Sequence, residues 1–205
     1  MSLRHQPKAA LINDFSGFGR CSVTVALPII SQMKVQCCPV LTSVFSNHTG
    51  YPSFYFDDHT EKMPSYIAEW KKLNLHFECI AAGFLGSERQ IEIVKNFIRD
   101  FKDETTKVLI DPVMGDHGRT YQTFTPEMCS QMKQLAHFAD ILTPNLTEAC
   151  ILTDTPYHDG HWQMSELSEL ALSLIAMGPS KVVITGVSMG TFIGNVICEI
   201  GRAHV

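Results

Sequence analysis

The sequence has little charge and no basic run. Charged residues make up 18% of its 205 positions, and the formal net charge at pH 7 is −5. A protein that follows a nucleic-acid backbone normally carries clustered lysine and arginine residues. The composition therefore makes nucleic-acid binding a poor explanation, and we expect no nucleic-acid partner.

Paired zinc-binding cysteines, a long apolar segment and an export signal are also absent. The seven cysteines are irregularly spaced and include no C-x-x-C pair. This pattern favours free thiols in a reducing compartment over disulfides or a zinc site. No segment approaches the roughly 20 apolar residues of a membrane-spanning helix, and MSLRHQPKAALINDF lacks the apolar core of a signal peptide. We expect a cytoplasmic protein without a membrane partner.

Two common nucleotide-binding motifs are missing as well. The segment NDFSGFGRCS (13–22) matches neither G-x-G-x-x-G nor G-x-x-x-x-G-K-[ST]. Gly17 and Gly19 permit a tight turn, and the N–H groups of a following helix would face an anion. An ordinary strand–helix turn explains the glycines equally well. Asp14 and Ser16 add polar groups that could bind a ligand.

What the sequence does have is an alternation of short apolar runs with helical patterns. The runs are rich in β-branched residues and predict strands. The predicted strands are Ala9–Ile12, Val40–Phe45, Cys79–Ala82, Val108–Ile110, Asp140–Leu142, Val182–Thr185 and Phe192–Cys198.

Helix signals lie between these runs. Ser87, followed by Gln90, predicts a capping box, and Thr125 before Pro126 predicts a second helix start. Gly178 permits a left-handed cap at the end of a third helix. The apolar side chains expected to be buried on the first and third helices are Ile91, Val94, Ile98, Phe101, Leu167, Leu170, Leu174 and Ile175.

This alternation favours a single domain over residues 1–205, with a mostly parallel sheet covered on both faces. One segment breaks it, because Ser53–Phe56 is bounded by Pro52 and an acidic pair. We interpret this segment as a short strand or hairpin that leaves the sheet and forms a small flap. Ligands of such sheets bind beyond the carboxyl ends of the strands, so the polar residues there are the candidates.

A polar cluster follows the second predicted strand. Ser46, Asn47, His48 and Thr49 are consecutive and could bind a polar ring through several hydrogen bonds. These residue types also favour turns that satisfy their own backbone. Both interpretations are open at this point.

Two acids follow the fourth predicted strand in DPVMGDHG (111–118). Pro112 favours an extended Asp111 and ends the strand, and Asp116 lies in a loop flanked by glycines. Mg²⁺ takes carboxylate oxygen from one or two groups together with water and phosphate. The pair therefore indicates a metal–nucleotide site, with an Asp that caps the next turn as the alternative.

The segment TPNLTEA (143–149) follows the fifth predicted strand. Asn145 fits a helix N-cap and Glu148 the matching capping-box position. The same residue types fit a metal or phosphate site. Thr185, at the end of the sixth predicted strand, suits a nucleotide contact, and all these side chains should meet at one edge of the sheet.

The motifs FSNHTGY, GFLGS, DPVMGD, TPNLTEA and MGPSKVVITG, in this order, resemble the pyridoxal kinases of the ribokinase-like superfamily. The resemblance implies a three-layer α/β/α sandwich. It also implies a phosphotransferase that phosphorylates the 5′-hydroxymethyl group of pyridoxal, pyridoxine or pyridoxamine with Mg-ATP. A homodimer in the cytoplasm and help from a monovalent cation such as K⁺ are further implications.

The resemblance also implies roles for individual residues. Thr49 and Phe84 would line the pyridine pocket, with Asp14 or Ser16 near the ring substituents. Phe84 stands where many relatives have Tyr, so stacking is kept and a hydroxyl is lost. The nucleotide and cation residues would be Asp116 and Glu148 for Mg²⁺ and phosphate, Asn145 beside them, Thr185 on the nucleotide, and Asp111 with Thr143 on the monovalent cation.

One part of the family pattern is missing. A G-T-G-D segment, which carries the general base, should follow, but the sequence reaches Val205 without it. We therefore expect a chain truncated in the C-terminal part of its fold, with the base beyond Val205. Two alternatives stay open: a hydroxymethylpyrimidine kinase of thiamine synthesis, and a B6-binding module without catalysis.

Overall fold

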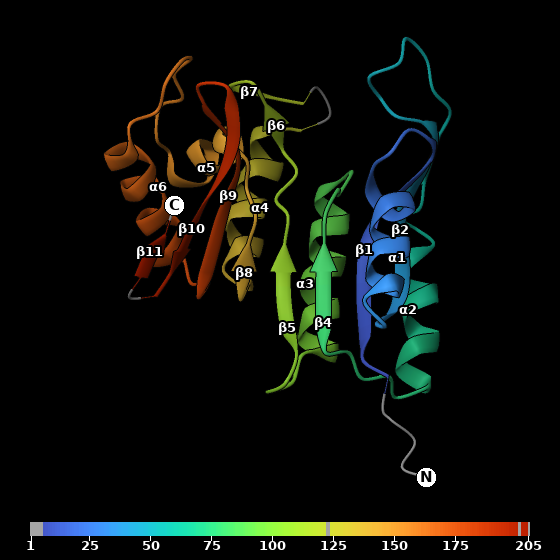
Figure 1. Ribbon diagram of the computed structural model, residues 1–205. Helices are drawn as coiled ribbons and strands as arrows, with labels where there is room; N and C mark the ends of the chain where they lie inside the picture. The colour runs from blue at the N-terminus through green and yellow to red at the C-terminus, as the bar shows by residue number, and fades with distance from the viewer. Residues whose placement is uncertain (1–5, 122–123, 201, 205) are drawn as a thin grey trace. The chain divides into compact units, whose positions relative to one another are not determined.

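The computed structural model describes residues 6–121, 124–200 and 202–204. It divides into two units, residues 1–107 and 108–205. Each unit contains both strands and helices (Figure 1). The expectation of a single domain stays a prediction.

The first unit is built around one central strand. β1 pairs in parallel with β2 on one side and with β4 on the other, and β3 pairs antiparallel with β2. The strands are β1 (Lys8–Phe18), β2 (Gln36–Asn47), β3 (Phe56–Asp58) and β4 (Cys79–Ala82). Parallel strands covered by helices read as nearly continuous apolar runs, and Ala9–Ile12 are all buried.

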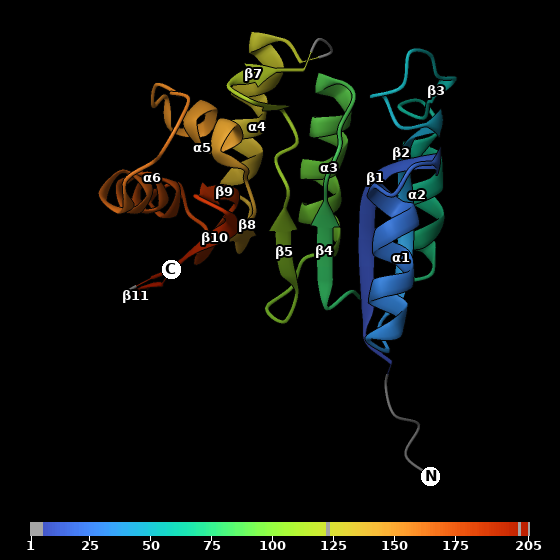
Figure 2. The ribbon, with the colours of Figure 1, turned by 45° about the horizontal axis from the view of Figure 1, so that its top comes forward.

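Three helices cover these strands: α1 (Ser22–Gln32), α2 (Met63–Lys72) and α3 (Glu88–Phe101). Figures 1 and 2 show α1 on one face and α3 on the other. The predicted stripe of α3 is buried. An aromatic core joins α2 to α3, since Trp70 and Phe97 both contact the ring of Phe77, which has no exposed surface.

The second unit has a mixed set of strands. β5, β8 and β9 are parallel, and β10 and β11 continue antiparallel from β9. β6 and β7 form a separate hairpin. The strands are β5 (Lys107–Ile110), β6 (Gly115–Asp116), β7 (Arg119–Thr120), β8 (Ile141–Leu142), β9 (Lys181–Met189), β10 (Phe192–Glu199) and β11 (Arg202–His204).

The helices of the second unit are α4 (Pro126–Ala136), α5 (Leu146–Thr153) and α6 (Met164–Ala176). Thr125 caps α4 by accepting from the Met128 N–H, with Pro126 in the first turn, as predicted. Gly178 has a φ of +131° after the end of α6, a conformation that glycine adopts readily. Of the predicted α6 stripe, Ile175 is only half-buried.

All seven predicted strands are present, and the predicted α/β fold with a mostly parallel sheet is confirmed. Three details differ. The expected flap strand is shifted to Phe56–Asp58 and stays in the sheet, because it pairs with β2. β1 continues through Asp14 and Ser16 to Phe18, so Gly17 lies in a strand and not in a turn. A Cβ at position 17 would lie only 3.0 Å from the carbonyl oxygen of Ser46.

The third difference concerns the capping box at α3. Ser87 does cap the helix by accepting from the Gln90 N–H. The Gln90 amide, however, turns into the interior: its Oε1 accepts from Gly86 N–H, and its Nε2 donates to Thr42 O, Asp58 and Thr60. The Gln90 side chain therefore binds these distant groups and does not make the expected capping-box bond to the backbone of Ser87.

None of the helices in the described part of the chain is long and apolar enough to span a membrane.

Candidate active site

Two buried polar side chains stand at the end of β1. Asp14 is 5% exposed and Ser16 is 2% exposed, where the β1–β2 register shifts between Asn13 and Phe15. Ser16 Oγ donates to Asp14 Oδ2 at 3.1 Å, and Ser22 Oγ donates to Oδ1 at 2.5 Å. The carboxylate is thereby held in one orientation by donors on both oxygens.

The backbone of Phe84 is fixed by two strands. Its N–H donates to Asn13 Oδ1 at 2.9 Å, and its carbonyl accepts from Thr42 Oγ1 at 3.0 Å. The half-buried ring packs edge-on against Phe45, with the ring centroids 5.9 Å apart. Phe84 thus offers a firmly placed aromatic surface.

The loop after β2 uses most of its polar groups internally. Ser46 Oγ accepts from the Tyr55 N–H, Asn47 Nδ2 donates to Ser53 O, and His48 Nδ1 accepts from the Gly50 N–H. These bonds match the turn interpretation. Thr49 differs, since it is exposed and its hydroxyl has no hydrogen-bond partner among the residues described, so it is available to a ligand.

In the second unit, the first turn of α5 binds the segment after β5. Asn145 and Glu148 form the expected capping box. Both side chains also reach the preceding loop: Glu148 Oε1 accepts from the Met114 N–H at 3.1 Å, and Asn145 Nδ2 donates to Gly115 O at 2.9 Å. The capping box and the loop are therefore one structure.

Two acids in this structure have strongly raised pKa values. Burial raises the pKa of Asp111 to about 6, against the opposing effect of a hydrogen bond from Thr143. Burial raises the pKa of Glu148 to about 8; backbone N–H donors lower it, and the charge of Asp111 raises it further. A bound cation would favour the ionised form of both carboxyls, because an opposite charge nearby stabilises it.

Asp116 is placed differently, on the exposed hairpin β6–β7. Its Oδ1 accepts from the His117 N–H at 2.8 Å. His117 and Gly118 have φ of +50° and +74°, as in the tight turns that join two-residue hairpins. The Asp116 carboxylate is exposed to solvent and can reach a ligand.

Thr185 lies next to Asn145 where β9 passes the start of α5. Its N–H donates to Pro144 O at 2.8 Å, and an isolated parallel bridge joins Thr185 to Asn145. The half-buried Thr185 and the carboxyl cluster thus belong to the same corner of the second unit.

A family model described as phosphomethylpyrimidine kinase matches residues 27–203. The chain belongs to this family. The matched range includes every candidate residue of this chain except Asp14 and Ser16.

Three relatives show the likeness in detail. A Bacteroides thetaiotaomicron protein, provisionally named a phosphomethylpyrimidine kinase, is 45% identical, with a TM-score of 0.92 over 98% of this chain and 69% of its own. A second crystal form of it contains pyridoxal. Pyridoxal kinase from Lactobacillus plantarum is 28% identical, with a TM-score of 0.87 over 98% of this chain and 71% of its own.

The third relative is pyridoxal kinase from Arabidopsis thaliana. It is 31% identical over 161 residues, which are 74% of this chain and 49% of the relative. The chain therefore spans about half the length of this curated relative.

The structure of this family member brings most predicted residues into two groups. Asp14 touches Ser16, while Thr49 lies on a separate loop of the same unit. In the second unit, Asp111 is hydrogen-bonded to Thr143 and its charge acts on Glu148. Asn145 is hydrogen-bonded to Glu148 and forms a parallel bridge with Thr185. Asp116 is linked to them through its neighbour Gly115.

Sequence reasoning missed several residues around these groups. The pKa of Tyr121 is raised first by burial and then by the charges of Glu148, Asp116 and Asp111, so its hydroxyl lies in the field of all three acids. A tyrosine shortly after Asp116 was a weak signal for it. Ser22 was also missed, because its contact with Asp14 depends on a φ of +54° that no motif indicates.

The donor set fits Mg²⁺ if the nucleotide supplies further oxygens. The described residues contain no group of three or more His, Cys, Asp or Glu side chains that could hold a metal alone. Mg²⁺ is commonly bound by one or two carboxylates with phosphate and water. The exposed Asp116 can supply such a carboxylate. Glu148 is buried, and a cation beside it would stabilise its ionised form.

Proposed function

We propose that this protein is an ATP-dependent kinase of the B6 vitamers pyridoxal, pyridoxine and pyridoxamine, acting on their 5′-hydroxymethyl group. The observation that carries the proposal is the corner of the second unit where Asn145 and Glu148 bind the loop after β5. Asp111 lies near enough for its charge to act on Glu148, and the exposed carboxylate of Asp116 lies on the same loop. Phosphoryl transfer depends on positioning and charge neutralisation, which is what such a corner supplies. The pyridoxal found in a 45% identical relative supports the choice of substrate.

The reaction forms a bond between the hydroxymethyl oxygen and the γ-phosphorus of ATP. The bond from that phosphorus to the β-phosphate oxygen breaks, and the alcohol proton passes to a general base that none of the assigned residues supplies. Mg²⁺, when bound, neutralises charge on the transferring group. Asp116 and Glu148 would hold it, Asn145 would orient Glu148, and Thr185 would contact the nucleotide.

Thr143 and Asp111 would bind a monovalent cation such as K⁺, because carboxylate and hydroxyl oxygens lie together there. In the first unit, Phe84 would stack on the pyridine ring and Thr49 would bind a ring substituent. Asp14, held by Ser16, would accept a hydrogen bond from another substituent. These roles assign the vitamer to the first unit and the nucleotide to the second.

The test is ADP release by the purified protein with Mg-ATP and each of the three vitamers, with hydroxymethylpyrimidine as the fourth substrate. Turnover confined to the vitamers would support the proposal. The name of the family model favours the pyrimidine as a second candidate, and turnover on it alone would establish that reaction. Vitamer binding without any turnover would leave a binding module.

Two substitutions separate the assigned sites. Asp116→Asn should raise the KM for Mg-ATP by about tenfold or more, the equivalent of ~1.4 kcal/mol, and leave vitamer affinity nearly unchanged. Thr49→Val should weaken vitamer binding and spare Mg-ATP. Equal losses of both substrates in either variant would contradict the assignment.

We also propose a cytoplasmic homodimer. Tyr51, Phe54 and Tyr55 are 47%, 46% and 65% exposed, and clustered exposed aromatic rings are typical of an interface. Sedimentation equilibrium of the protein and of Tyr55→Ser checks this. A monomer at micromolar concentration would refute it.

A further inference from the structure

The turn of the β6–β7 hairpin is held by a side chain of the TPNLTEA motif for which no role was predicted. The Gly118 N–H donates to Thr147 Oγ1 at 2.9 Å. Thr147 lies in the first turn of α5 and is only 3% exposed. The threonine end of this hydrogen bond is therefore buried, while Gly118 itself is exposed. Removing the bond would leave a buried threonine oxygen without its donor, which costs stability.

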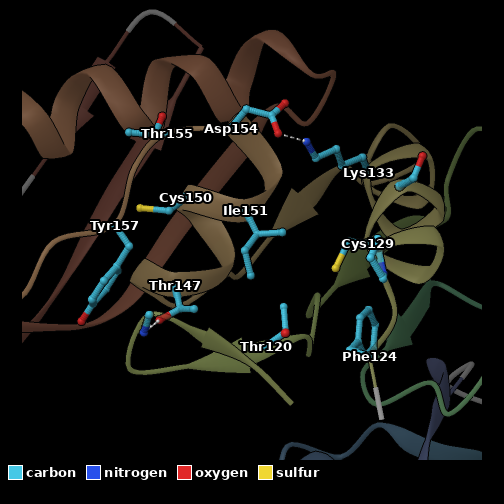
Figure 3. A pocket seen from close by; sticks show the side chains of 13 residues that line it. Thr120, Phe124, Cys129, Lys133, Thr147, Cys150, Ile151, Asp154, Thr155 and Tyr157 are labelled. Carbon is cyan, nitrogen blue, oxygen red and sulfur yellow. Dashed lines mark hydrogen bonds and ion pairs between the residues drawn. The ribbon is translucent and has the colours of Figure 1, made fainter. Parts of the chain in front are cut away.

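A second side chain supports the same residue from the loop after α5. A Cβ placed on Gly118 would lie 2.5 Å from Cδ1 of Tyr157 and 2.8 Å from its Cε1. The ring thus packs directly against the glycine backbone. Figure 3 shows Tyr157 and Thr147 on the same side of the cavity, with the hydrogen bond that Thr147 accepts drawn as a dashed line.

These two contacts complete a row along the segment that carries Asp116. Glu148 accepts a hydrogen bond from the N–H of Met114, and Asn145 donates one to the carbonyl of Gly115. Thr147 accepts one from the N–H of Gly118. All three side chains come from the start of α5. Asp116 itself is left exposed, with its backbone fixed on both sides.

The turn borders a cavity. A cavity of about 610 Å³ is lined by Gly118, Thr147 and Tyr157 together with Cys150 and Ile151 of α5, among others (Figure 3). The turn therefore borders open space beside its two supports, Thr147 and Tyr157. A turn released from Thr147 has room to move, and Asp116 moves with it.

We propose that Thr147, supported by Tyr157, is a positioning residue that sets the place of the Asp116 carboxylate for the metal–nucleotide. The inference rests on the proposed kinase function and deepens it. Thr147 touches neither substrate; it acts through the backbone of Gly118.

The experiment compares Thr147→Val, which keeps the shape and removes the acceptor, with Thr147→Ser, which keeps the acceptor. The matched control is Thr153→Val on the same helix, because the Thr153 hydroxyl donates to the Ala149 carbonyl of α5 itself. The first readout is hydrogen exchange at the Gly118 amide. We expect exchange about tenfold faster in Thr147→Val, and near the parent rate in Thr147→Ser and Thr153→Val.

The second readout is calorimetric affinity for Mg-ADP and, separately, for pyridoxal. Thr147→Val should weaken Mg-ADP by about tenfold and leave pyridoxal binding unchanged, with Thr147→Ser restoring the parent affinity. Should Thr147→Val fail to fold, Tyr157→Leu tests the same turn from its other side, with faster exchange at Gly118 and weaker Mg-ADP binding expected.

Unchanged exchange at Gly118 in Thr147→Val would overturn the inference, as would an equal loss of both ligands. Failure of the parent protein to bind Mg-ADP would instead refute the proposed function, and with it the role of Thr147 in nucleotide binding. The exchange rates would still show whether Thr147 holds the turn.

Discussion

Replacing Glu148 with Gln should remove much of the pH dependence of folding stability. The pKa of Glu148 is raised from 4.5 to about 8 in the folded protein. Between these values the unfolded chain has lost the proton and the folded chain keeps it. Folding is therefore favoured at low pH, and this contribution is lost as pH rises through the folded pKa.

The size of the effect follows from one proton. A difference of one bound proton changes the free energy of unfolding by ~1.4 kcal/mol per pH unit. From about pH 5 to about pH 8, Glu148 alone accounts for a decrease of ~4 kcal/mol. Asp111, with its pKa raised from 3.8 to about 6, acts in the same direction at the lower end of this range.

Gln has nearly the same shape and no proton to lose. Its single amide oxygen cannot replace both carboxyl oxygens, which accept from Met114 and Asn145. Glu148→Gln should thus be less stable than the parent at about pH 5, with a flatter profile that meets the parent profile as pH rises.

The assay is urea unfolding at several pH values, followed by fluorescence of Trp70 and Trp162. Glu127→Gln is the matched control, because it removes an exposed carboxyl from the first turn of α4 and should keep the parent slope. Parallel pH profiles for the parent and Glu148→Gln would refute the reasoning.

Three further predictions concern the first unit, all measured by urea unfolding. Gln90→Leu should lower the free energy of unfolding by ~2–4 kcal/mol, because the Gly86 N–H and the oxygens of Thr42 and Thr60 lose a partner. A decrease no larger than that of a surface substitution would contradict this. Ser87→Ala should cost ~1 kcal/mol through the lost N-cap, with Ser87→Asn near the parent as its control. Phe77→Ala should cost ~3–5 kcal/mol because the ring is fully buried, and a stable variant would show that the aromatic core can collapse around the gap.

The strands were predictable because burial on both faces imposes apolar runs. Val108–Ile110 and Val182–Ile184 are visible in the sequence for this reason, and each carries fully buried side chains. Helix starts were predictable where the cap is local, as at Thr125 and Asn145. Both kinds of signal depend on neighbours along the chain.

The remaining elements depend on distant partners. β3 is three residues long and exists because β2 offers a free edge. The polar end of β1 is a strand only because it pairs with β2 as far as Asn47. Gln90 faces inward because Thr42 and Thr60 provide buried partners far from it in sequence.

The candidate site divides in the same way. That polar residues would gather after β5 and β8 followed from the rule for parallel strands. Asn145 and Glu148 are hydrogen-bonded, and Asp111 is near enough for its charge to raise the pKa of Glu148. Which atoms bond to which could not be predicted. The hydrogen bond from Gly118 to Thr147 joins residues 29 positions apart in the sequence and depends on the conformation of the hairpin turn.

The central place of β1 has a consequence for synthesis of the protein. Ala9 pairs with Cys37 on one side and with Cys79 on the other, so β1 leaves the ribosome long before its second neighbour exists. At roughly 5–20 residues per second, one edge of this apolar strand stays unpaired for a time on the order of seconds. During that interval the nascent chain presents a ready template for pairing with other chains, so we expect shielding of this strand edge to matter most at this stage of synthesis.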